Sequence, residues 1–158
     1  MSRMLVILLS LGLTACAWAE TATNAAISSP GLDMAIVDKM SGPAFESLVC
    51  TLLKHQCYKI GNLHESNDYG VDMVASKDEE RLAVQVQHSK EKIPRKAISD
   101  AMGGMKYFKC TKSMVVTNNE FTEDACELAR GNDCILVDRV VLQRWLDSFK
   151  QARVVVLP

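Results

Sequence analysis

The sequence predicts an α/β domain with a mixed central β-sheet flanked by helices. Two consecutive strand-like segments are joined by a polar turn, and the later strand-like segments alternate with helical ones. A hairpin makes neighbouring strands antiparallel, whereas strands separated by helices usually pair in parallel. The chain of 158 residues, 48% hydrophobic and 23% charged, has the length and composition of one globular domain.

The first helix of this domain is predicted to begin at Ser41 and Pro43. Ser is a favoured N-cap and Pro is tolerated in the first turn. Glu46 lies at the edge of the apolar stripe that this helix would bury. A short strand is expected to follow from Tyr58. The stripe itself shows helical spacing and consists of Phe45, Leu48, Val49, Leu52 and Leu53.

The hairpin allows its register to be predicted. Strands are expected at 70–76 and 81–88, and a turn of two or four residues makes paired positions sum to 157. Asp72 would then face Gln85 across the ladder. Alternation along the second strand also puts Gln87 on the same face as Gln85. We therefore expect Asp72, Gln85 and Gln87 to converge on one surface.

The remaining elements follow as helix, strand, helix, strand and helix. Pro94 begins the second helix, and Thr122 caps the third. Strands are predicted at 113–117 and 135–137, and the last helix is marked by Leu142, Trp145, Leu146 and Phe149.

The N-terminus has the pattern of an export signal. Arg3 precedes the apolar run 4–13, so residues 1–19 are predicted to be a signal peptide or a lipoprotein leader. Cleavage before Cys16 would lipidate Cys16 and tether the protein to a membrane, whereas cleavage after Ala19 would release it. Residues 20–39 are expected to form a flexible linker, and the domain is expected to occupy 40–158. The alternative is a cytoplasmic protein whose translation starts at Met34 or Met40.

The other five cysteines form no pattern that assigns a role. They are an odd number without a CxxC pair, which is typical neither of a disulfide framework nor of a zinc site. We expect most of them to be small buried side chains. The sequence also allows one disulfide bond.

Several short segments together resemble the Mrr-type restriction endonucleases of the PD-(D/E)XK nuclease superfamily. The resemblance covers about 42–146 and is carried by these segments in order: Phe45-Glu46, 68–72 (Asp-Tyr-Gly-Val-Asp), 83–86 (Ala-Val-Gln-Val), 104–108, 115–118, Phe121-Thr122 with Ala125, and 135–138. It implies a restriction-endonuclease-like core for 40–158. It also implies a metal-dependent DNA endonuclease of the type IV restriction kind.

The resemblance implies a role for individual residues. Asp72 matches the metal-binding aspartate, Gln85 the second ligand and Glu46 an assisting helix glutamate, so all three are candidate ligands of Mg²⁺ or Mn²⁺. Gln87 stands where the family has a catalytic lysine, and an amide cannot neutralise charge. The alternative is therefore a catalytically impaired DNA-binding member of the fold. A third reading is an envelope protein that uses the fold for protein contacts only.

Double-stranded DNA is the expected partner, and a homodimer stays open. The formal net charge of -1 excludes a positive field over the whole protein, so any DNA surface must be local. Residues 90–112 are locally basic, and a solvated helix face is the alternative reading of that pattern. The candidate DNA contacts are Lys90, Lys92, Arg95 and Lys96. Lys90 is also a candidate replacement for the missing lysine, although alternation would place it on the opposite face.

Overall fold

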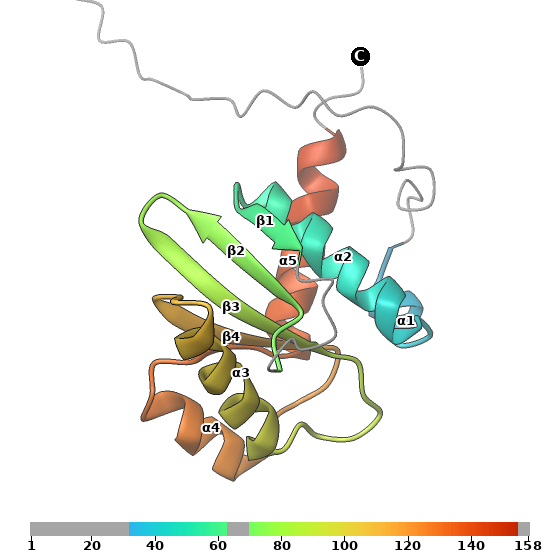
Figure 1. Cartoon of the computed structure of the whole chain (residues 1–158). Coiled ribbons are helices and arrows are strands. Elements are labelled where there is room, and N and C mark those ends of the chain that lie inside the picture. Colours follow the sequence, from blue (N-terminus) through green and yellow to red (C-terminus); the bar gives the residue numbers. More distant parts are fainter. Residues whose placement is uncertain (1–31, 63–69, 155–158) are drawn as a thin grey trace, which may run out of the picture.

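The computed structural model describes residues 32–62 and 70–154, which form a five-stranded mixed sheet with helices on both faces (Figure 1). The predicted fold class is confirmed. The strands follow one another across the sheet in chain order, from β1 to β5. The elements are α1 (Met34–Val37), α2 (Gly42–His55), β1 (Lys59–Asn62), β2 (Met73–Lys77), β3 (Glu80–Gln87), α3 (Arg95–Tyr107), β4 (Lys112–Thr117), α4 (Glu123–Arg130), β5 (Ile135–Val137) and α5 (Arg139–Val154).

The two faces of the sheet are covered by different helices. On one face, Val84 and Val86 of β3 belong to a core that includes buried residues of α1, α2 and α5. On the other face, Val115 of β4 packs with buried residues of α3 and α4. Figure 1 shows α2 and α5 on one side of the sheet and α3 and α4 on the other. The sheet is thus the middle layer of three.

The predicted helix starts are confirmed. The Ser41 hydroxyl accepts a hydrogen bond from the Ala44 N–H (3.4 Å), and the Thr122 hydroxyl accepts one from the Ala125 N–H (3.4 Å). Both satisfy backbone donors that the first helical turn leaves without a partner. Pro94 directly precedes α3.

The hairpin register is also confirmed within the ladder. Met73 pairs with Val84 and Lys77 with Glu80, so paired positions sum to 157. The turn has two residues, and Asp78 in it adopts a positive φ of 51°. β3 and β4 then pair in parallel, as do β4 and β5.

The prediction of a flexible linker at 20–39 is wrong for residues 32–39. Asp33 caps α1, and Val37 is completely buried in the core beside Leu32 and Met34. The domain therefore includes at least 32–39. A helix of four residues shows too little periodicity to be seen in the sequence. The leader at 1–19, Cys16 and its lipidation, and the linker up to residue 31 lie outside the described residues.

No helix within 32–62 or 70–154 has the length and apolar character needed to cross a bilayer. The cysteines in the same ranges form no disulfide bond.

Candidate active site

Asp72 lies at a β-bulge where the chain enters β2. The Asp72 N–H donates to the carbonyl of Val84 (2.9 Å), although Val84 is already the ladder partner of Met73. Two consecutive residues therefore face one residue of β3, which is the arrangement of a bulge. The predicted pairing of Asp72 with Gln85 is accordingly shifted by one residue at this point. Strand alternation cannot reveal such a shift, because it assumes a regular pleat.

A hydrogen bond to its side chain also ties Asp72 to β3. The Val86 N–H donates to Oδ2 of Asp72 (2.5 Å). The backbone and the side chain of Asp72 thus bind the residues before and after Gln85 in β3. Together the two bonds place Asp72 against the part of β3 that contains Gln85.

The side-chain oxygen of Gln85 has no hydrogen-bond partner. Gln85 pairs with Val115 across β3 and β4, and its Oε1 atom is buried and unpartnered among the described residues. An acceptor left unsatisfied costs about 1–3 kcal/mol. Such an atom in a central strand calls for an explanation. A cation bound by Gln85 Oε1 would supply one.

Gly70 brings the start of β2 against α3. Gly70 has a φ of +74°, and a Cβ atom built on it would lie 2.6 Å from Cβ of Asp100. Only glycine permits both this conformation and this close approach. Because Asp72 follows two residues later, the contact with Asp100 helps to set where Asp72 enters the sheet. The sequence indicated the glycine but not its neighbour.

Glu46 lies on the helix that covers the opposite face of the sheet. The preceding residue, Phe45, is completely buried in the core of α1, α2 and α5, and its ring meets the His88 ring edge-on at 5.4 Å. α2 is therefore close to the end of β3. The side chain of the half-buried Glu46 nevertheless forms no hydrogen bond or ion pair with any residue of the described ranges. Among the described residues, Glu46 makes no hydrogen bond or ion pair with Asp72 or Gln85.

Gln87 ends β3 on the same side as Gln85. It pairs with the buried Thr117 of β4 and is itself half-buried. The next residue, His88, is an anchor: its Nε2 lies 2.9 Å from the carbonyl of Val37. Within the described ranges, no three His, Cys, Asp or Glu side chains are grouped to hold a metal ion. A site here would need the amide oxygen of Gln85.

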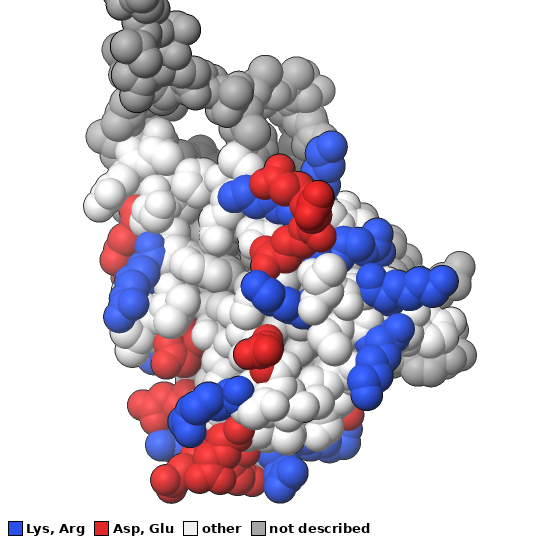
Figure 2. All heavy atoms as spheres, turned by 90° about the vertical axis from the view of Figure 1, so that its left-hand side faces the viewer, with Lys and Arg blue, Asp and Glu red and all other residues white. Residues whose placement is uncertain are grey.

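The four candidate DNA contacts differ in their surroundings. Lys92 forms an ion pair with Glu120 (2.7 Å), and Lys96 forms one with Asp100 (2.6 Å). Lys90 and Arg95 form no ion pair with any residue that the structure describes. The face in Figure 2 carries positive and negative side chains side by side and not one continuous basic field.

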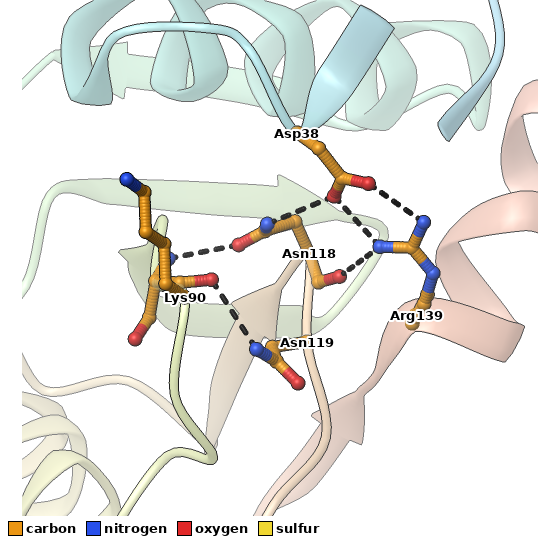
Figure 3. A pocket seen from close by; sticks show the side chains of 6 residues that line it. Asp38, Lys90, Asn118, Asn119 and Arg139 are labelled. Atoms are coloured by element: carbon orange, nitrogen blue, oxygen red, sulfur yellow. Dashed lines mark hydrogen bonds and ion pairs between the residues drawn. The ribbon is translucent and has the colours of Figure 1, made fainter. Parts of the chain in front are cut away.

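A polar pocket of about 340 Å³ lies where β3 and β4 end (Figure 3). Both guanidinium NH2 groups of Arg139 bind the Asp38 carboxylate at 2.7 Å, and Asn118 donates to it at 3.1 Å. The hydrogen bond from Arg139 is the main reason why the pKa of Asp38 lies below its usual range. The pocket is lined by Asp38, Ser89, Lys90, Asn118, Asn119 and Arg139.

The sequence does not indicate this pocket. Its pattern places Asp38 in the predicted linker and gives no role to Arg139, 101 residues away. The available signal was weak: polar residues directly follow two parallel strands, whose carboxyl ends commonly form binding sites.

The five-stranded sheet with its flanking helices is the fold of a restriction-endonuclease-like domain. The family model Mrr_cat, described as a restriction endonuclease, matches residues 37–146. The chain therefore belongs to this family, as the resemblance predicted.

Solved structures show the same fold at low sequence identity. The DNA modification-dependent restriction endonuclease AspBHI matches with a TM-score of 0.57 and 12% identity over 78% of this chain. MspJI restriction endonuclease in complex with a 27-mer oligonucleotide matches with a TM-score of 0.53 and 15% identity over 81% of this chain. A protein of unknown function, AF1548, matches with a TM-score of 0.52 and 18% identity over 59% of this chain.

The matched region is only part of each of these proteins. It covers 38% of the AspBHI chain, 34% of the MspJI chain and 55% of the AF1548 chain. No curated protein matches the chain significantly.

Proposed function

We propose that the protein is a metal-dependent DNA endonuclease that hydrolyses phosphodiester bonds. The observation that carries this proposal is the buried, unpartnered Gln85 Oε1, together with the hydrogen bonds that tie Asp72 to Val84 and Val86 on either side of Gln85. Membership of a restriction endonuclease family and the likeness to MspJI, solved with an oligonucleotide, support DNA as the substrate.

The residues present suit a hard divalent cation. Mg²⁺ and Mn²⁺ prefer oxygen ligands, and Asp72 and Gln85 offer a carboxylate and an amide oxygen. When bound, the ion polarises the phosphate and lowers the pKa of a bound water. In this proposal, Val86 holds the Asp72 carboxylate in place through its N–H. Glu46 is a further candidate donor, because its helix lies close to the end of β3.

Gln87 favours a second candidate function. The side chain here can donate a hydrogen bond to a phosphate but brings no positive charge. Losing one charge-stabilising group typically lowers a rate by about 10²–10³. The second candidate is therefore a DNA-binding domain with impaired catalysis.

Nicking of supercoiled plasmid DNA in Mg²⁺ or Mn²⁺ separates the two candidates. We expect slow nicking that is abolished in Asp72→Asn, because the carboxylate ligand is lost. Gln87→Lys is expected to raise the rate by about 10² or more. Gln151→Lys makes the same chemical change at an exposed position of α5 and should leave the rate unchanged.

The outcomes are distinct. Nicking by the natural protein that survives Asp72→Asn would contradict the proposed site. Binding of DNA without nicking, with nicking gained only in Gln87→Lys, would establish the second candidate. If no variant binds or nicks DNA, both candidates are wrong.

A further inference from the structure

The pocket at the ends of β3 and β4 is built from four separate segments. Asp38 follows α1, Ser89 and Lys90 follow β3, Asn118 and Asn119 follow β4, and Arg139 begins α5. Figure 3 shows Asp38, Asn118 and Arg139 directed toward one another, with the amino group of Lys90 lying apart from them. Of these residues, only Lys90 is among the candidate DNA contacts predicted from the sequence.

Hydrogen bonds fix the walls of the pocket. Asn118, only 4% exposed, accepts a bond from the Ser89 N–H (2.8 Å) through its side-chain oxygen. Its amide donates to Asp38 (3.1 Å), and the Asn119 amide donates to the Ser89 carbonyl (3.4 Å). Arg139 also donates to the Asn118 carbonyl (2.9 Å). The segment that carries Lys90 is thereby tied to the end of β4.

The pocket has one positive side chain that no carboxylate within it neutralises. The Asp38 carboxylate and the Arg139 guanidinium neutralise each other through two short hydrogen bonds. Lys90 is exposed, and its amino group forms no ion pair with a described residue (Figure 3). An ammonium group at a polar, solvent-open pocket attracts an anion, and phosphate is a common partner of lysine.

The pocket is close to the proposed site of cleavage. Ser89 follows Gln85 by four residues, which is roughly 13 Å of extended chain. Successive phosphates of one DNA strand advance about 3.4 Å along the helix axis. A strand whose scissile phosphate lies at Asp72 and Gln85 would therefore bring a phosphate a few nucleotides further along within reach of Lys90.

We infer that this pocket is a binding subsite for a backbone phosphate that flanks the scissile phosphate, with Lys90 as its charge and Asn119 as a neutral donor. The inference rests on the proposed function, because it takes DNA as the ligand. The Asp38–Arg139 pair holds the walls in place and contacts neighbouring protein groups, not the phosphate.

Salt-dependent binding of a fluorescent DNA duplex tests the subsite in the full chain. Lys90→Gln should weaken binding several-fold and lower the slope of log K against log salt by about one. Lys54→Gln is the matched control, since it removes the same charge from an exposed position in the last turn of α2, outside the candidate DNA contacts. Its slope should change clearly less.

A second measurement uses inorganic phosphate and NMR of the side-chain amides. We expect the Asn119 amide signal to shift on titration in the natural protein, and this shift to disappear in Lys90→Gln. Equal salt slopes for Lys90→Gln and Lys54→Gln would overturn the DNA subsite. This holds even if inorganic phosphate still shifts the Asn119 signal, since that result would indicate a pocket for free phosphate compounds. If the natural protein binds DNA but neither measurement responds to Lys90, the subsite is wrong and the proposed function stands. If the natural protein binds no DNA, the proposed function falls and the DNA subsite falls with it.

Discussion

Gln85 and Gln87 carry the same amide group on the same side of β3, yet their surroundings suit them to different roles. The oxygen of Gln85 is buried and lacks a partner, so a cation would relieve an unfavourable state. Gln87 is half-buried at the end of the strand, where its lack of charge is what matters. The proposed metal ligand and the proposed catalytic defect are thus two residues apart.

Asp38 should make the stability of the domain depend on acid pH. Its pKa lies below the ordinary value of 3.8, chiefly because of the hydrogen bond from Arg139. A carboxyl group with a lowered pKa stabilises the folded state above its unfolded pKa, and that stabilisation is lost as the pH falls through the folded pKa. Asp38→Asn should therefore lower the free energy of unfolding at pH 7, and the difference should decrease as the pH falls below 3.8.

Urea unfolding at several pH values measures this effect. Both partners are partly exposed, so we expect roughly 1 kcal/mol or less at pH 7. Asp78→Asn is the control: Asp78 is an exposed turn residue with positive φ, a conformation that Asn tolerates equally. A difference for Asp38→Asn that stays constant from pH 7 to pH 3 would contradict the ion pair.

Among the elements, β3 organises the site, because it carries Gln85 and Gln87 and pairs with strands on both sides. At the bulge, the Val86 N–H bonds to the Asp72 side chain instead of a neighbouring backbone carbonyl. Hydrogen exchange at this one amide should therefore report on the Asp72 side chain.

Asp72→Ala removes the acceptor of the Val86 N–H, whereas Asp72→Asn keeps an oxygen that can accept it. Exchange of the Val86 amide should be about 3- to 10-fold faster in Asp72→Ala than in Asp72→Asn, which corresponds to one hydrogen bond of about 1 kcal/mol. The Leu82 amide, inside the regular ladder, serves as the internal reference. Equal Val86 rates in the two variants would show that Asp72 is not held as described.

Most elements could be predicted because their signals are local. Ser41, Thr122 and the two-residue turn act within a few positions of the chain, and the confirmed register follows from the turn alone. The shift at Asp72 could not be predicted, because a bulge depends on how two strands separate. α1 was missed because its burial comes from contacts with distant elements.

At the scale of the whole molecule, only some of the residues predicted to share the metal site lie near each other in the fold. Asp72 and Gln85 are neighbours, but Glu46 comes from a helix on the other face of the sheet. In the pocket at the ends of β3 and β4, Asp38, Asn118 and Arg139 form hydrogen bonds with one another although they are far apart in the chain. Only a three-dimensional structure places such residues together.

We further propose that the chain is exported through its N-terminal leader and lipidated at Cys16. Mass spectrometry of the protein isolated from its own membranes should find a lipid-modified Cys16 as the first residue. Cys16→Ser should lose the modification and leave the membrane fraction. An N-terminus at Glu20 in the natural protein would instead indicate a released protein, and one at Met34 would contradict export.

The bond between Asp38 and Arg139 connects residues 101 positions apart. During synthesis, α1 emerges from the ribosome early, but its guanidinium partner emerges only when α5 begins. Long-range contacts of this kind form late and slow the folding of a domain. The chain must therefore be synthesised beyond Arg139 before the pocket can assemble, so shorter nascent chains would lack the proposed phosphate subsite.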